Sequence, residues 1–476
     1  MSEGATPGRL AGGSYDLVIL GGGPAGDFAA EAAARRGARA ALVVPPLEEP
    51  KPLEPTPLRE EIRRLQARFG LVLRWPPPRL PRVDVCLGQP VFHRDRTIAV
   101  GDRELGFRRA ILAPGTKPAG PPFPGADEAG CLRPETLAQL GEVPRRLAVI
   151  GLGAEGCTWA QAFCGLGSQV HLIGRETAVL TGEDPDAAAV VQARLQQDGV
   201  RLHTDCAETA VETTGNLRSV VLSCNGRKEK LLVDEVLVCA ARRPDVSELA
   251  LETAGVACDA RGIAVDACLR TSNRRVFAAG AVLAAAFASR QAARATAELA
   301  VRNALRWFPR SAGRLVVSRC IHTEPAVASA VLAGTVLAGA AEKGRAETGR
   351  LEADVYRAEL ADADSSLPAS LREGFVKLEV QRRSGRVQRA LVVAERADEL
   401  LAPLALLMAR GLPIDTLAEP FFCHSSRSEL LVRVAQRARE ERRLSSGARI
   451  PACCGAVPRT IGRHSIHPPP STRSLW

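Results

Sequence analysis

The chain has 476 residues, of which 46% are hydrophobic and 24% charged, a composition typical of a globular protein with two or three domains. Its formal net charge is +10, but the arginines are scattered along the sequence without a nucleic-acid motif, so we expect no nucleic acid and no membrane as partner. The sequence contains no apparent signal peptide and no uninterrupted apolar run of about 18 residues. Its thirteen cysteines mostly stand singly in apolar segments, which predicts a cytoplasmic protein with small buried thiols.

Residues 16–44 have the pattern of a strand, an alanine-rich helix and a second strand, with Gly21-x-Gly23-x-x-Gly26 in the first turn. In such a motif the first glycine permits a tight turn and the second lets the backbone approach a pyrophosphate. The third lets helix and strand pack closely, while the helix N-terminus faces the anion. We therefore predict a dinucleotide-binding turn. A turn that only holds the fold, without a ligand, is the alternative.

A linker and a run of short strands come next. Residues 45–57 are rich in proline and glutamate and cannot form a helix, whereas residues 58–69 have the pattern of a short amphipathic helix. Residues 83–113 indicate short strands separated by turns, and they lead into Ala113-Pro114-Gly115.

A second motif, Gly151-x-Gly153-x-x-Gly156, lies in a strand–turn–helix–strand pattern within a segment that runs from about residue 145 to 238. The second strand of this segment ends at Gly174-Arg175, and no acidic residue stands at that point to bind a ribose 2′-hydroxyl. Arg175 suits a 2′-phosphate, which favours NADP(H). An arginine that only faces solvent is the alternative.

The last part of the chain first returns to the strand-and-helix pattern and then changes. Residues 250–308 indicate a strand, a turn and an alanine-rich helix that extends to Trp307. From residue 312 onward, strands and helices indicate a compact α+β unit. Residues 441–476 are rich in arginine, serine and proline and are predicted to be a disordered tail. The predicted fold class is α/β, with two Rossmann-like dinucleotide-binding domains and a C-terminal α+β domain.

Over residues 15–436 this layout resembles the flavin-dependent pyridine nucleotide–disulfide oxidoreductases, most closely those of the mercuric reductase and dihydrolipoamide dehydrogenase type. The segments that carry the resemblance are HLIGRETAVLTGEDPD, TSNRRVFAAGAV, IHTEPAVASAVL and GFVKLEVQRRSGRVQRALVVAERADELL. The resemblance implies an FAD-binding domain at 15–118 and 250–311, an NAD(P)-binding domain at 119–249 and a dimerisation domain at 312–440. It also implies FAD and NAD(P)H as cofactors, a homodimer, and cofactor contacts at Gly115 and Gly280.

Several positions depart from the family pattern. The family passes electrons to a CxxxxC disulfide after the first strand–helix–strand unit, but here Val44 leads into the proline-rich linker and the nearest cysteine is Cys86. The acidic residue that would hold the adenosine ribose is Val44, and the aspartate expected after Gly280 is Ala281. The helix glutamate beside the nicotinamide is Thr158. Its usual lysine partner is missing too, which is coherent because a buried unpaired carboxylate is destabilising.

Two further features remain as candidate sites. His424 and Glu429, in FFCHSSRSEL, match the acid/base histidine of the family and the glutamate that orients it, and an inherited structural hydrogen-bond pair is the alternative. Cys453 and Cys454 are adjacent thiols in the tail, which suits soft metals, and an adventitious pair is the alternative.

The function predicted from the sequence is an FAD-dependent NAD(P)H oxidoreductase without a redox-active disulfide. It would pass a hydride from nicotinamide to flavin and then reduce a diffusible small-molecule electron acceptor. A degenerate homologue that binds a nucleotide for a structural or regulatory role is the alternative. Soft-metal handling through Cys453 and Cys454 is the third hypothesis.

Overall fold

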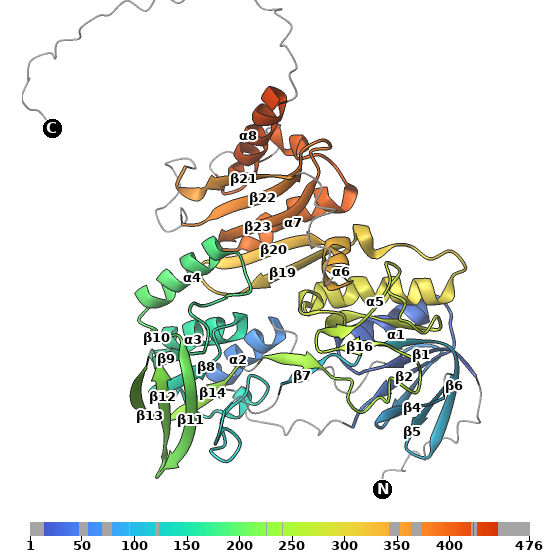
Figure 1. The fold of residues 1–476 in the computed structure, drawn as a ribbon, viewed down its shortest axis with the longest axis horizontal. Coiled ribbons are helices and arrows are strands. Elements are labelled where there is room, and N and C mark those ends of the chain that lie inside the picture. The colour runs from blue at the N-terminus through green and yellow to red at the C-terminus, as the bar shows by residue number, and fades with distance from the viewer. Residues whose placement is uncertain are drawn as a thin grey trace, which may run out of the picture.

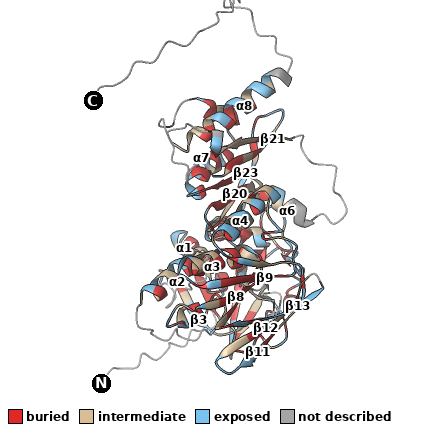
Figure 2. Cartoon of the chain, turned by 90° about the vertical axis from the view of Figure 1, so that its left-hand side faces the viewer, coloured by how far each residue is buried: buried red, intermediate tan, exposed pale blue. Residues whose placement is uncertain are grey.

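The structure is a computed structural model, in which two nucleotide-type domains lie side by side below a C-terminal sheet (Figure 1). It describes residues 14–46, 56–68, 79–94, 96–119, 123–224, 226–239, 241–341, 353–362, 373–419, 422 and 426–445. Figure 2 shows buried residues along the strands of each domain and exposed residues on the outer loops and helices. The predicted α/β fold class is confirmed.

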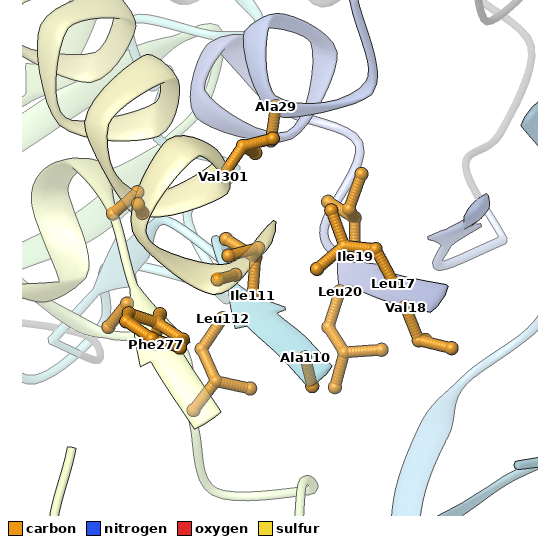
Figure 3. Close-up of a cluster of buried hydrophobic side chains, with 14 of the residues drawn as sticks. Leu17, Val18, Ile19, Leu20, Ala29, Ala110, Ile111, Leu112, Phe277 and Val301 are labelled. Atoms are coloured by element: carbon orange, nitrogen blue, oxygen red, sulfur yellow. The ribbon is translucent and has the colours of Figure 1, made fainter. Parts of the chain in front are cut away.

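The first nucleotide-type domain is built on a parallel sheet whose central strand ends in a continuous apolar run. Residues Leu17 to Leu20 of this strand are fully buried, because both faces of a parallel sheet are covered (Figure 3). The parallel strands are β3 (Val83–Leu87), β2 (Ala40–Val44), β1 (Tyr15–Leu20), β6 (Arg103–Leu112) and β18 (Val276–Ala278), in that spatial order. The antiparallel strands β5 (Thr97–Val100) and β4 (Pro90–Arg94) continue from β6.

Two alanine-rich helices, α1 (Pro24–Arg35) and α5 (Arg290–Leu305), cover this sheet. Their small side chains let the helices approach closely, and Ala29 and Val301 point toward one another in Figure 3. Because β18 pairs with β6 and α5 packs beside α1, residues 276–305 belong to the same layers as the N-terminal strand and helix. The helix predicted to extend to Trp307 ends at Leu305 instead.

The second nucleotide-type domain repeats the arrangement on a smaller scale. Its parallel sheet has the order β10 (Arg201–His203), β9 (Gln169–Ile173), β8 (Arg146–Ile150) and β14 (Glu235–Val238), with helices α3 (Ala154–Gly165) and α4 (Pro185–Gln197). An antiparallel sheet of β11 (Cys206–Thr214), β12 (Leu217–Cys224) and β13 (Arg227–Val233) extends from it. Helix α2 (Pro57–Arg68), where we predicted a helix over 58–69, buries Leu58, Ile62 and Leu65 in the core of this domain.

Short elements connect the two domains. Strands β7 (Thr116–Pro118) and β15 (Arg242–Pro244) pair antiparallel between them, and β16 (Cys258–Asp259) pairs with β17 (Gly262–Ile263). The 3-10 turns described within and between the two nucleotide-type domains are Leu137–Gln139, Gly280–Val282 and Ala285–Phe287.

The C-terminal domain has an antiparallel sheet in the order β19 (Val316–Ile321), β20 (Ala326–Leu332), β23 (Val387–Ala394), β22 (Phe375–Gln381) and β21 (Ala353–Glu359). Its helices are α6 (Ala333–Ala341), α7 (Ala397–Arg410) and α8 (Glu429–Ser445), with 3-10 turns at Ala312–Arg314, Leu360–Asp362 and Ile414–Ala418. Helix α8 continues to Ser445, so residues 441–445 of the predicted tail are helical, and residues 446–476 lie outside the described residues. Lys377 of β22 joins this domain to α4, with its ammonium 2.9 Å from Asp184 and 3.0 Å from Asp186.

The expectation of small free thiols throughout is wrong at one place. Cys206 and Cys224 form a disulfide in the second nucleotide-type domain. Although 18 residues separate them, antiparallel pairing of β11 with β12 places them directly opposite one another. In the part of the chain that the structure describes, no helix is long and apolar enough to cross a bilayer.

Candidate functional site

The first glycine turn joins the carboxyl end of β1 to the N-terminus of α1, and two of its glycines are required by the fold alone. A Cβ on Gly21, whose φ is +126°, would lie 2.0 Å from the carbonyl oxygen of Ala113. A Cβ on Gly26 would lie 1.8 Å from the carbonyl oxygen of Gly21. Both contacts are backbone against backbone and exist whether or not a ligand is bound. These two glycines therefore carry no information about binding.

Gly23 is different, because neither strain nor packing requires a glycine there. Its φ is −86°, and a Cβ at this position would meet nothing within 4 Å. No side chain caps the N-terminus of α1 at Gly23, whereas the carboxylate of Asp184 caps α4 and the hydroxyl of Ser289 caps α5. An open, uncapped helix N-terminus with room at its second glycine is the geometry that a pyrophosphate needs.

The other residues predicted to contact the flavin lie near this turn. Gly115, with φ +78°, follows the Ala113-Pro114 backbone against which Gly21 packs. Gly280 also has φ +78°, and a Cβ on it would lie 2.7 Å from the Cβ of Ala25 in the first turn of α1. The Gly280 N–H donates to the Thr296 hydroxyl at 2.9 Å. The fold thus brings both glycines to the carboxyl edge of the sheet beside α1.

Two family contacts for a dinucleotide are replaced by apolar groups at this edge. Val44 is 1% exposed, and one of its methyl groups would lie 2.5 Å from a Cβ on Gly22. Ala281 follows Gly280 in the 3-10 turn Gly280–Val282 and offers no hydrogen-bonding side chain. The turn therefore retains its phosphate-binding geometry, and it lacks side-chain partners for the ribose and for a polyol chain.

The second glycine turn, between β8 and α3, has the same construction. A Cβ on Gly151 would lie 2.3 Å from the Cys239 carbonyl oxygen, and one on Gly156 would lie 1.8 Å from the Gly151 carbonyl oxygen. At Gly153 a Cβ would again meet nothing within 4 Å, φ is −78°, and no side chain caps α3. Two turns that are far apart in the sequence thus share one glycine that the backbone does not need.

Polar and thiol groups near the second turn have shifted pKa values. Burial raises the pKa of Glu155 in the first turn of α3; the charge of Arg242 opposes this shift, and the Glu135 carboxylate adds a smaller increase. Burial raises the pKa of Cys157 to about 12, and burial together with Glu155 raises the pKa of Cys239 well above its ordinary value. Sequence reasoning missed Glu155, whose only signal was its place inside the glycine motif.

Thr158 occupies the position where the family has a helix glutamate. It is 2% exposed, and its hydroxyl donates to the Ala154 carbonyl oxygen at 2.9 Å. This bond satisfies the hydroxyl within its own helix, so Thr158 supplies neither a charge nor a free proton to the site.

The two side chains that follow β9 bear on the choice between NADH and NADPH. Arg175 is exposed, which is compatible both with the predicted contact to a 2′-phosphate and with an arginine that only faces solvent. One carboxylate oxygen of Glu176 would lie 2.8 Å from a Cβ on Gly174, so Glu176 folds back over the end of the strand toward Leu152. Sequence reasoning looked for an acid only at the strand end and missed Glu176. Arg175 and Glu176 are both exposed and follow the carboxyl end of β9.

Ion pairs and hydrogen bonds link the two segments that connect the nucleotide-type domains. The Arg242 guanidinium lies 2.6 Å from the Glu135 carboxylate and donates to the hydroxyl and carbonyl oxygens of Thr116 at 3.0 and 2.8 Å. Lys117 lies 2.7 Å from Asp245. These bonds join the segment that leaves the first domain to the segment that returns from the second.

The remaining predicted site residues are placed only in part. Glu429 is the first residue of α8 and is half-buried, and its N–H donates to the Ser426 carbonyl oxygen at 3.1 Å. Its predicted partner His424 and the thiols Cys453 and Cys454 lie outside the described residues. Within the described ranges no group of three or more His, Cys, Asp and Glu side chains is arranged to hold a metal ion.

Comparison with known proteins identifies the family. Residues 15–300 match the model of the pyridine nucleotide-disulphide oxidoreductases, and residues 317–435 match the dimerisation domain of these enzymes. The chain belongs to the pyridine nucleotide-disulphide oxidoreductase family. This confirms the resemblance noted from the sequence. Members of the family bind FAD and use NAD(P)H.

Several members of the family are similar to this chain. A mercuric reductase of Bacillus cereus is 30% identical over 337 residues, which cover 71% of this chain and 52% of the relative. A dihydrolipoyl dehydrogenase of Geobacillus stearothermophilus is 26% identical over 75% of this chain and 74% of the relative. The chain spans only 52 to 63% of the length of the first mercuric reductases that it matches. The HOCl-induced flavoprotein disulfide reductase RclA of Escherichia coli shares the fold, with a TM-score of 0.70, 22% identity, and coverage of 89% of this chain and 99% of that one.

Proposed function

We propose that the chain is an FAD-dependent NAD(P)H oxidoreductase of the cytoplasm that transfers electrons to a diffusible small-molecule acceptor without a CxxxxC disulfide. The observation that carries the proposal is the open space at Gly23 and Gly153. Neither backbone strain nor packing requires glycine at these two N-cap positions, because any residue adopts their φ values and a Cβ would meet nothing within 4 Å, so the two glycines leave room for a ligand at the helix N-termini.

The residues around the first turn fit a flavin dinucleotide in part. The free amides at the N-terminus of α1, with Gly23 giving access, would hold the pyrophosphate, and the backbone at Gly115 and Gly280 would flank the rest of the cofactor. When bound, a flavin supplies two-electron chemistry between a nicotinamide and an acceptor. Without a carboxylate at Val44 or Ala281 we expect weaker binding than in relatives that have one, by about 1 kcal/mol for each lost hydrogen bond.

Two features support a route without a disulfide. No two cysteines of the sequence are separated by four residues. Thr158, bonded to its own helix, replaces the glutamate that in relatives pairs with a lysine of the disulfide helix. In a chain without a CxxxxC disulfide, a reduced flavin would transfer its electrons to an external oxidant, such as a quinone or dioxygen.

The second candidate is a degenerate homologue that binds a nucleotide but does not turn over. The buried methyl groups of Val44 against Gly22, and Ala281 at the end of the Gly280 turn, favour this candidate. The two candidates predict the same fold and the same glycines, and they differ in whether a flavin is held firmly enough to be reduced.

The visible spectrum of the purified full-length protein tests the proposal. We expect flavin absorbance, bleached by NADH or NADPH without oxygen and restored by a quinone or by air. Turnover should be unchanged after the accessible thiols are alkylated. A colourless protein that stays colourless after incubation with excess FAD would remove the oxidoreductase proposal and leave the degenerate homologue. Inactivation by alkylation would contradict the route without a disulfide.

The homodimer is part of the proposal because residues 317–435 match a dimerisation domain. His424 and Glu429 stay predicted as an acid/base pair. If they act on the acceptor, His424→Ala should lower kcat with the acceptor and leave the anaerobic bleaching by NAD(P)H unchanged.

A further inference from the structure

The arginines that are scattered in the sequence gather at one edge of the first nucleotide-type domain. This edge holds the amino ends of β1, β6 and β18, opposite the carboxyl ends where the glycine turn lies. Arg108 and Arg109 lie near the start of the paired part of β6, and Arg275 immediately precedes β18. Loss of hydration and then the charges of Arg275, Arg108 and Arg270 lower the pKa of Arg109.

A depression at this edge is lined by arginines. It has a volume of about 360 Å³, and its lining includes Arg96, Arg108, Arg109 and Arg275. Asp16 offsets part of the charge, with its carboxylate 3.4 Å from the Arg108 guanidinium. The guanidinium fork binds phosphate oxygens in pairs, so a group of four around one depression suits a phosphate ester.

A second arginine cluster lies at the ends of α1 and α5, which reach the same edge. Loss of hydration and then the charges of Arg310, Arg306 and Arg36 lower the pKa of Arg302. The amide of Asn303 donates to the carbonyl oxygens of Cys268 and Arg310 at 2.9 and 2.8 Å. Because Cys268 lies two residues before Arg270, this amide joins the loop after α5 to the first cluster. We call the two clusters together the basic edge.

Two aromatic side chains project from the basic edge. Trp307 is 91% exposed and Phe308 is 81% exposed, in the loop between Arg306 and Arg310. Neither side chain lines the arginine depression. Large aromatic side chains that are this exposed mark a surface that is covered in use. Tryptophan and phenylalanine flanked by arginines are the residues that enter the interface of an anionic bilayer.

Against the expectation from the sequence that no membrane is a partner, we propose that the basic edge, with Trp307 and Phe308 inserted, docks the protein onto the surface of an anionic phospholipid membrane. The phosphate of a lipid headgroup would occupy the arginine depression, while the aromatic rings would enter the boundary of the acyl chains. A nucleic acid fits less well, because aromatic stacking platforms lie within the charged groove that follows the backbone. The docking surface does not depend on the proposed electron transfer. If both hold, the enzyme would meet a lipid-soluble acceptor at the membrane.

Co-sedimentation of the full-length protein with vesicles tests the docking surface. We expect binding to vesicles of equal parts phosphatidylcholine and phosphatidylglycerol, weakened by salt, and little binding to phosphatidylcholine alone. Trp307→Ala/Phe308→Ala should lower the partition coefficient by about tenfold or more. Arg306→Gln/Arg310→Gln should lower it by about fivefold for each arginine.

Matched controls come from exposed residues elsewhere. Leu406→Ala removes a side chain that is 60% exposed on α7, and Arg227→Gln/Lys228→Gln removes two exposed charges from β13. Both controls should bind vesicles as the unaltered protein does. Brominated phospholipid should quench the fluorescence of bound protein, and Trp307→Phe should abolish most of this quenching while the protein still binds.

Four outcomes would overturn the docking surface. They are an absence of binding to anionic vesicles, equal binding by the variants of the basic edge, quenching that persists in Trp307→Phe, and binding of a single-stranded DNA oligonucleotide in place of vesicles. A change in sedimentation coefficient caused by Trp307→Ala/Phe308→Ala, without vesicle binding, would assign the loop to a contact between copies of the chain. None of these measurements requires flavin or turnover, so a failure here is distinct from a failure of the proposed function.

Discussion

Alanine substitutions of single glycines in the first turn distinguish a glycine that the fold requires from a glycine that ligand binding requires. In Gly26→Ala the new Cβ would stand 1.8 Å from the Gly21 carbonyl oxygen, where real Cβ atoms stay beyond 3.0 Å. The joint between β1 and α1 must therefore open, and overpacking of this kind destabilises a protein by about 1–3 kcal/mol. For a domain of this size each kcal/mol lowers Tm by about 2–4 °C. The loss should appear in the cofactor-free protein.

Gly23→Ala should instead affect ligand binding and leave the stability of the fold nearly unchanged. The new Cβ meets nothing within 4 Å at a φ of −86°. The lower entropy of the unfolded chain contributes about 0.4–1 kcal/mol, which offsets the poorer helix N-cap. Stability should thus change little, while a Cβ in the place of the pyrophosphate should weaken FAD binding by about tenfold or more, or about 1.4 kcal/mol.

Urea unfolding of the cofactor-free variants and titration with FAD measure the two quantities. Gly141→Ala is the matched control, because a Cβ there also meets nothing within 4 Å and the residue lies outside the turn. The reasoning is refuted if Gly23→Ala destabilises the cofactor-free protein as much as Gly26→Ala does, or if it binds FAD with unchanged affinity.

Three further outcomes are expected. Arg175→Ala should raise KM for NADPH more than KM for NADH, and Glu176→Ala should do the opposite, measured from initial rates of flavin reduction, because the two charges favour different 2′-substituents. Cys224→Ser, which removes the disulfide of a loop spanning 18 residues, should lower the free energy of unfolding by about 2–3 kcal/mol in urea titrations. The hydrogen bond from Lys377 is the largest cause that lowers the pKa of Asp186, so this pair should stabilise the fold above pH about 4 and be lost as pH falls below it. Lys377→Met should therefore reduce the urea midpoint at pH 6, and the reduction should become smaller as the pH is lowered below about 4.

Much of the fold follows from patterns among residues that are close together in the sequence. The glycine spacing and the apolar runs of β1 and β8 predict strand, turn and helix because these depend on neighbours in the sequence. Local patterns also predict a strand, a turn and an alanine-rich helix within residues 250–308, whereas the place of this strand beside β6 comes from the tertiary structure. The ends of elements are less certain, because tertiary packing decides where a helix frays. Helix α5 ends two residues before Trp307, and α8 continues to Ser445.

Site residues could be predicted from the sequence where their role depends on the motif in which they stand. They could not be predicted where their role depends on segments that are distant in the sequence. Glu176 escaped notice because its side chain folds back over Gly174, an orientation that the sequence does not encode locally. The Cys206–Cys224 disulfide was missed because strand register, and not spacing, places the two thiols opposite one another.

The sequence by itself determined the two nucleotide-type turns, the α/β class and the missing CxxxxC spacing, since each depends on residues that are close together along the chain. Only the tertiary structure decided which glycines serve packing and which leave room for an anion, because that depends on the Ala113 and Cys239 carbonyls arriving from other strands. It also decided that arginines with no pattern in the sequence meet at the amino edge of one sheet, because parallel strands bring their starting residues together.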